Sequence, residues 1–185
     1  LPEFNNMSEV STNREYKSIL DNYSIGETLL GFYASDNFLK QLKGDAICSN
    51  DCDSIKVYST EFFKDNEISP DLLKLIFDEV LKKFQSDAEE LVDDVLKRTD
   101  LQETISIENP VIIDVFDDSD NIKSFLMLSE VSNFEIEQNT LQLTLLNMAI
   151  IENKLIYFAY YLNYDNADSV ENIKSKNLSF SKKLL

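Results

Sequence analysis

Residues 140–164 read TLQLTLLNMAIIENKLIYFAYYLNY, and the predicted fold class follows from this segment. Residues 140–150 are mostly apolar, and residues 154–164 are rich in the aromatic side chains that strands favour. The polar pair Glu152-Asn153 interrupts them, and Asn readily adopts a tight-turn conformation. The segment therefore predicts two antiparallel strands joined by a short turn.

Two further strands precede this hairpin. Residues 111–116 (VIIDVF) and 124–132 (SFLMLSEVS) are apolar, and the polar run 117–121 (DDSDN) between them is typical of a turn. Together with residues 140–150 and 154–164 they predict an antiparallel meander of four strands. Parallel strands would need longer crossover connections between them.

Helices are expected on both sides of this meander. Ser69-Pro70-Asp71 is a typical helix start, and apolar residues then recur every three or four positions as far as Arg98. Similar spacing predicts helices within 14–33, over 37–42 and over 165–184. The predicted fold class is α+β: a four-stranded antiparallel meander covered by a long helix and a C-terminal helix, with N-terminal helices.

The chain is expected to form a single domain over residues 5–185. Leu1-Pro2-Glu3-Phe4 resembles a cloning remnant, because Glu-Phe is encoded by a common restriction site. If a signal peptide has been removed, the mature protein begins at Asn5. If the native chain instead begins at Met7, then Asn5 and Asn6 also come from the vector. We prefer the first account.

Acidity is the dominant global property. The chain has 34 Asp and Glu against 17 Lys and Arg, which gives a net charge of −17. Such a charge repels nucleic acids and anionic membrane surfaces, and it favours a basic protein partner or cations. No run of about 18 apolar residues predicts a membrane span. The alternative reading is that the charge only keeps the protein dispersed.

The composition excludes several catalytic classes. Without any His, the chain lacks Ser-His-Asp and Cys-His catalytic groups, and three scattered Gly cannot form a phosphate-binding loop. Paired carboxylates remain open in principle. We expect no enzyme activity and no cofactor.

One face of the predicted long helix is acidic, and we expect it to bind the partner. Concentrated negative charge on a rigid helix accelerates association with a basic protein. The alternative is an ordinary solvent-exposed helix surface. The predicted partner-binding residues are Asp78, Glu79, Glu89, Glu90, Asp93 and Asp94.

A second acidic group surrounds the predicted turn at 117–121. A turn can bring several carboxylates to one hard cation such as Ca²⁺, although this segment does not match the EF-hand pattern. The alternative is a solvated acidic turn. The candidate metal ligands are Asp114, Asp117, Asp118 and Asp120.

The two cysteines lie close together in Cys48-Ser-Asn-Asp-Cys52. A zinc site needs about four ligands and no His is available, while a redox motif normally has two intervening residues. A local disulfide bond between Cys48 and Cys52 is therefore expected in an oxidising compartment. Two free thiols in the cytosol are the alternative.

The strand at residues 155–161 (LIYFAYY) is unusually aromatic. Because strand side chains alternate, Tyr157, Ala159 and Tyr161 share one face while Phe158 and Tyr160 share the other. We expect one set in the core beneath the helices. The second set is either also packed or exposed for binding.

A strand ending in Asn147-Met148-Ala149 is followed by a turn with Asn153-Lys154, the aromatic strand 155–161 and a closing helix. In this arrangement the C-terminal part of the chain resembles the DcrB and PsbP-like proteins of bacteria and plastids. The resemblance covers about a quarter of the chain. It implies an exported, non-catalytic protein with an adaptor or chaperone role, and no functional residue can be carried over.

These features together predict a non-catalytic, acidic protein-binding module. An immunity or inhibitor protein that neutralises a basic toxin or effector is the most concrete form. The alternatives are a ligand- or calcium-binding envelope domain and a structural or adaptor subunit of an envelope complex. A periplasmic or secreted location is expected, with the cytoplasm as the alternative.

Overall fold

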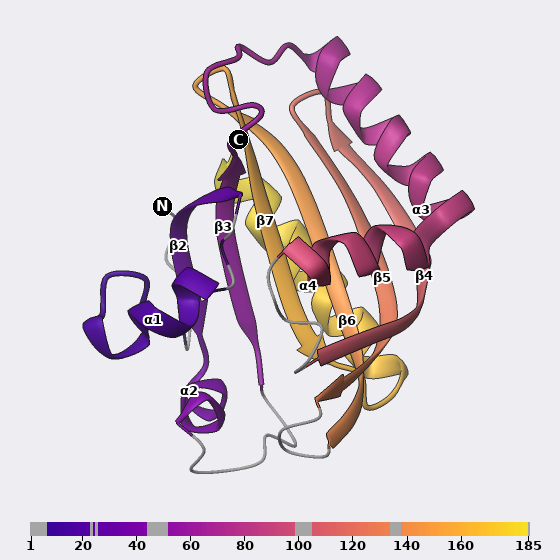
Figure 1. The fold of residues 1–185 in the computed structure, drawn as a ribbon. Helices are drawn as coiled ribbons and strands as arrows, with labels where there is room; N and C mark the ends of the chain where they lie inside the picture. The colour runs from indigo at the N-terminus through magenta and orange to yellow at the C-terminus, as the bar shows by residue number, and fades with distance from the viewer. Residues whose placement is uncertain are drawn as a thin grey trace.

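The computed structural model describes residues 7–22, 24, 26–43, 52–98, 105–133 and 138–184, which form one sheet with helices on both faces (Figure 1). The strands are β1 (Ser8–Glu9), β2 (Glu27–Ala34), β3 (Ser54–Thr60), β4 (Ile105–Ser119), β5 (Ile122–Asn133), β6 (Gln138–Ile151) and β7 (Lys154–Asn163). The helices are α1 (Arg14–Asn22), α2 (Asp36–Leu42), α3 (Pro70–Arg98) and α4 (Ala167–Leu184).

The sheet is antiparallel throughout, with the strand order β1-β2-β3-β7-β6-β5-β4. Its C-terminal half, β4 to β7, is joined by consecutive connections. Strand β3 then pairs with β7, and Ile55 lies opposite Tyr160. Two segments far apart in the sequence are therefore neighbours in the centre of the sheet.

The β6–β7 connection shows how local sequence sets the register. Glu152 and Asn153 have positive φ angles of 50° and 62°, the conformation of a two-residue hairpin turn whose twist matches that of the strands. Ile151 consequently pairs with Lys154, and the ladder continues without a shift to Gln142 and Asn163.

The predicted fold class is wrong in the extent of its sheet, which has seven strands rather than four. The strands predicted between residues 111 and 164 form only part of it, because β1, β2 and β3 extend the sheet beyond β7. Residues 27–33 of the expected helical region 14–33 are strand, whereas the helices expected in its first half and over 37–42 are present as α1 and α2. The chain is predominantly a β-protein with helices packed on it.

Strand β2 was predicted as helix because its apolar residues do not alternate. Phe32 and Ala34 pack beneath α1 and α2, whereas Tyr33 on the other face belongs to the core beneath α4. A strand covered on both faces loses the two-residue period. A register shift at Leu29/Gly31 blurs the pattern further.

The long helix was also predicted incorrectly as continuous. Helix α3 begins at Pro70, but Asp87 has φ −146° and ψ 43°, which are not helical values. The Ser86 hydroxyl donates to the Lys83 carbonyl oxygen (3.4 Å) and to Asp87 Oδ2 (2.8 Å). Such local side-chain bonds compete with helical ones. The two halves of α3 run in different directions (Figure 1).

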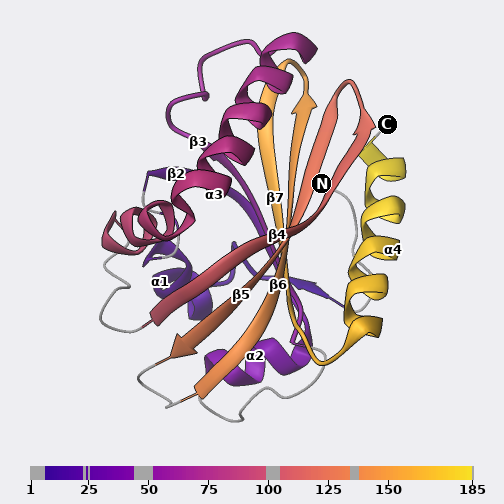
Figure 2. The same ribbon diagram turned by 90° about the vertical axis from the view of Figure 1, so that its right-hand side faces the viewer.

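The molecule has three layers, with α3 and α4 on opposite faces of the sheet (Figure 2). Ile173 of α4 is fully buried against one face, and Leu73 and Phe77 of α3 are buried against the other. Helices α1 and α2 pack on β2, on the same face as α3, because Phe32 shares that face with its cross-strand partner Lys56 and with Tyr58. Among the described helices, none is both long and apolar enough to cross a membrane.

Candidate functional site

The predicted acidic face is only partly acidic in the first half of α3. Asp78 and Glu79 are exposed, but Asp78 forms an ion pair with Lys74 one turn earlier. Lys82 and Lys83 are exposed one turn later. Opposite charges at this spacing largely cancel at a distance, so this half of the helix presents a mixed surface.

The kink at Asp87 separates the remaining predicted residues from Asp78 and Glu79. Glu90 is exposed beyond the kink, whereas the side chains of Glu89, Asp93 and Asp94 lie outside the described residues. Because the helix changes direction there, Glu90 does not continue the straight helix that carries Asp78 and Glu79 (Figure 1). The expectation of one continuous helix is therefore wrong, and partner binding by these acids stays a prediction.

Strand β4 is the second acidic element, and it forms the outer edge of the sheet. It carries acidic residues and no Lys or Arg: Glu108, Asp114, Asp117 and Asp118. Its central residues Val111, Ile113 and Val115 are 55%, 41% and 46% exposed. An edge strand leaves half of its backbone N–H and C=O groups unpaired by the sheet.

Three register irregularities interrupt the pairing of β4 with β5. They lie between Glu108 and Val111, between Ile112 and Asp114, and between Phe116 and Ser119. Bulges of this kind increase local twist and are common at sheet edges, where they discourage indiscriminate pairing. Within the described part of β4, segment 111–116 carries the exposed apolar side chains, and it contains the central irregularity, at which Ile113 has no partner in β5.

Three of the four predicted metal ligands lie on β4 itself, and only Asp120 lies in the turn that follows it. The strand continues to Ser119, so the turn is Asp120-Asn121, and Asp114 lies opposite Leu126 well inside the ladder. The side chains of Asp117 and Asp118 lie outside the described residues. In the part of the chain that is described, no group of three acids, Cys or His is arranged to hold a metal ion.

Asp114 instead binds groups of the protein itself. Its Oδ2 accepts from Lys174 Nζ of α4 at 2.6 Å, and its Oδ1 accepts from the Val115 backbone N–H at 2.9 Å. The hydrogen bond from Lys174 is the main reason that the pKa of Asp114 lies below its ordinary value. Asp114 thus joins the edge strand to α4.

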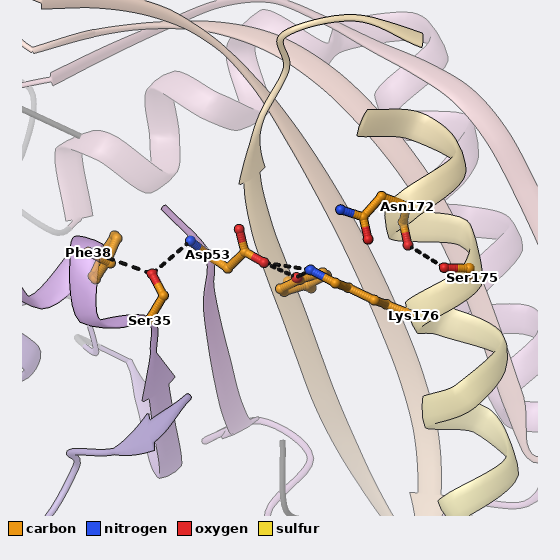
Figure 3. Close-up of polar contacts among 7 residues, drawn as sticks. Ser35, Phe38, Asp53, Asn172, Ser175 and Lys176 are labelled. Carbon is orange, nitrogen blue, oxygen red and sulfur yellow. Dashed lines mark hydrogen bonds and ion pairs between the residues drawn. The ribbon is translucent and has the colours of Figure 1, made fainter. Parts of the chain in front are cut away.

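A buried polar cluster that the sequence did not suggest connects β3, β7 and α4 (Figure 3). The Asp53 carboxylate accepts hydrogen bonds from the Tyr160 hydroxyl and, at 2.6 Å, from Lys176 Nζ. Lys176 also lies 5.1 Å from the centre of the Tyr160 ring. The Asp53 side chain is 10% exposed and that of Lys176 42%, so the cluster opens to solvent only through the lysine.

Ser35 anchors the other side of Asp53. Its hydroxyl accepts from the backbone N–H of Asp53 (3.2 Å) and of Phe38 (3.3 Å), the second contact being the N-cap of α2. Cys52 directly precedes Asp53 and is disulfide-bonded, whereas Cys48 lies outside the described residues. The Asp53 cluster therefore ties α2, the start of β3 and α4 together.

The aromatic strand β7 has packed side chains on both faces. Phe158 and Tyr160 belong to the core beneath α4, and Tyr157 stacks on Tyr58 of β3 with ring centres 5.1 Å apart. Beside this pair, Lys56 forms an ion pair with Glu27 and lies 4.8 Å from the Tyr58 ring centre. Tyr157 and Tyr160 are therefore both packed, which is the first of the two alternatives given for the second set of aromatic side chains.

Burial of the tyrosines raises their pKa values. The pKa of Tyr157 rises to about 12, chiefly through desolvation, with a smaller contribution from the Glu27 charge. Desolvation is also the largest cause of the raised pKa values of Tyr58 and Tyr161. The neutral phenols are therefore favoured in the folded state.

We expect these tyrosines to make the fold sensitive to alkali. Tyr157 ionises near pH 10 in the unfolded chain but near pH 12 in the folded one. The unfolded state therefore loses its proton first, and stability falls as pH rises between these values, by about 3 kcal/mol for this residue. Over this pH range, the free energy of unfolding of Tyr157→Phe, measured with urea, should fall by about 3 kcal/mol less than that of the wild type. Equal slopes for the variant and the wild type would contradict the prediction.

No protein-family model, curated protein or solved structure matches this chain. The resemblance to DcrB and PsbP-like proteins thus remains a prediction.

Proposed function

We propose that this protein is a non-catalytic module that binds a basic protein partner, and that it acts as an inhibitor or immunity protein for a cationic effector. The proposal is carried by the one-sided charge of β4 and its flanks. Between Arg98 and Lys123 the chain contains seven acidic residues and no basic one: Asp100, Glu103, Glu108, Asp114, Asp117, Asp118 and Asp120. Lys174 of α4 compensates the charge of Asp114. The remaining excess of one sign attracts a partner of the opposite sign and accelerates its docking.

The position of β4 supports this reading. The strand lies at the sheet edge, where its backbone and side chains are accessible, whereas the first half of α3 carries interspersed lysines. Glu108 is exposed on β4, and Glu90 is exposed on the second half of α3. The partner is expected to approach from this side. The same field disfavours nucleic acids.

An exported location is part of the proposal. It is supported by the disulfide bond of Cys52, because structural disulfides persist mainly in oxidising compartments. The adaptor role suggested by the C-terminal resemblance is compatible with the same binding chemistry.

The test is the salt dependence of a purified interaction. Basic proteins recovered on the immobilised chain at low salt should be purified and their association rates measured at about 50 and 500 mM salt, where screening lengths differ several-fold. We expect the rate constant to fall at least about tenfold, as electrostatic steering predicts. The proposal would be overturned if only acidic proteins were recovered, or if the association rate constants did not change with salt.

Matched charge variants locate the surface. Glu90→Gln/Glu108→Gln and Asp21→Asn/Asp36→Asn each remove two charges, taking the net charge from −17 to −15. All four residues are exposed, but Glu108 lies on β4 and Glu90 on the second half of α3, whereas Asp21 and Asp36 lie on α1 and α2. The first variant should slow association about three-fold or more and the second much less. Equal effects would show that only the total charge matters.

A further inference from the structure

Resting on the proposed function, we infer that the β4 edge binds the partner as an added antiparallel or parallel strand: an extended segment bearing Lys or Arg, with apolar residues at alternate positions. Proteins recognise extended segments in this way when a sheet edge is accessible, since backbone hydrogen bonds supply affinity and alternate side chains supply specificity. The relevant part of the edge is segment 111–116.

The accessibility of this edge follows from the layer arrangement. Strand β4 runs across the front of the molecule in Figure 2, with α3 on one side and α4 on the other, and neither helix crosses in front of it. Val111, Ile113 and Val115 are about half exposed there. Three exposed β-branched side chains within five residues offer an added strand apolar contacts on both faces.

The charge of β4 determines which segment fits. The strand holds four acids and no basic residue, so an incoming Lys or Arg opposite Glu108 or beside Asp114 makes a favourable cross-strand pair. A second copy of this chain fits poorly. An antiparallel β4–β4 pair centred on Ile113 would place Glu108 opposite Asp118, and like charges directly opposite each other are destabilising.

The same edge carries features that limit promiscuous pairing. Pro110 lacks an N–H, and the Val115 N–H donates to the Asp114 carboxylate. One bulge interrupts segment 111–116 at Ile113, and two others lie at its ends. A partner strand must therefore be short. Its Lys or Arg must also draw the Asp114 carboxylate away from its present partners. Selectivity therefore rests on charge as well as on backbone pairing.

The experiment uses an 11-residue peptide of alternating Lys and Val and two N-methylated forms of it. Each form carries methyl groups on the backbone nitrogens of one edge, so charge and side chains are unchanged while pairing through that edge is blocked. We expect the unmethylated peptide to bind. One methylated form should bind at least about tenfold more weakly, a loss of about 1.4 kcal/mol. Amide exchange in 111–116 should slow on binding.

A matched pair of protein variants completes the test. Ile113→Lys on β4 and Leu141→Lys on β6 add the same charge at residues 41% and 43% exposed. Only Ile113→Lys should weaken peptide binding about tenfold, since Lys on an edge opposes strand addition. Equal binding of all three peptides would overturn edge pairing and leave the proposed function standing. Failure of the unmethylated peptide and of basic proteins to bind would overturn both. If the wild type forms a dimer that Ile113→Lys abolishes, the occupant of the β4 edge is a second copy of this chain and not a basic segment.

Discussion

Replacing Phe125 by Ala is expected to lower the free energy of unfolding by about 4 kcal/mol. Phe125 on β5 is 1% exposed, and its ring centre lies 5.4 Å from that of Phe84 and 6.2 Å from that of Phe77, both on α3. The substitution removes the side chain that joins the first half of α3 to the sheet and leaves a cavity that rigid strands cannot close.

Urea unfolding followed by far-UV circular dichroism measures this loss as a lower midpoint. The control is Phe62→Ala, because Phe62 is 78% exposed and contacts Phe63 outside the core. It should cost less than about 1 kcal/mol. Similar losses in both variants would mean that α3 is not held by this aromatic contact.

The second large effect is expected at the buried Asp53 cluster. In Lys176→Met the Asp53 carboxylate stays buried with only the Tyr160 hydroxyl and no cation. Removing one partner of a buried ion pair costs about 3–5 kcal/mol. Because the Lys176 side chain is 42% exposed, water can reach the site, and about 2 kcal/mol is a more realistic expectation here.

The matched control is Lys174→Met on the same helix. Lys174 pairs with Asp114 on the surface, where both side chains are about one-third exposed. Its loss should cost no more than about 0.5–1 kcal/mol. Comparison with Asp53→Asn and with the double variant then gives the coupling between Asp53 and Lys176. A coupling near zero, or equal costs for the two lysines, would refute a docking role for this cluster.

The sequence predicted the strands of the C-terminal half because they are long and apolar, and because Glu152 and Asn153 mark a turn. It failed where tertiary contacts override local pattern. Strand β2 is buried on both faces and so lacks alternation, and helix α3 bends at Asp87 although its apolar period continues from Phe84 to Ala88. Neither feature has a local signal strong enough to find it.

The binding surfaces were predictable only in composition. The excess of acids between Arg98 and Lys123 is visible in the sequence, but the sheet order that puts β4 at an edge is not. The Asp53 cluster brings together residues 53, 160 and 176, whose proximity depends on the β3–β7 pairing. An isolated Asp beside a cysteine gave no reason to select it.

The β3–β7 pairing also governs when the protein can fold. During synthesis β2 and β3 leave the ribosome long before β7, which lies about a hundred residues later, as the separation of Ile55 and Tyr160 illustrates. Until then, two strands with apolar residues on both faces have no sheet to join. Closing so long a loop slows folding and leaves the nascent chain exposed to aggregation. Completion of the sheet therefore depends on β7, the last of its strands to be synthesised.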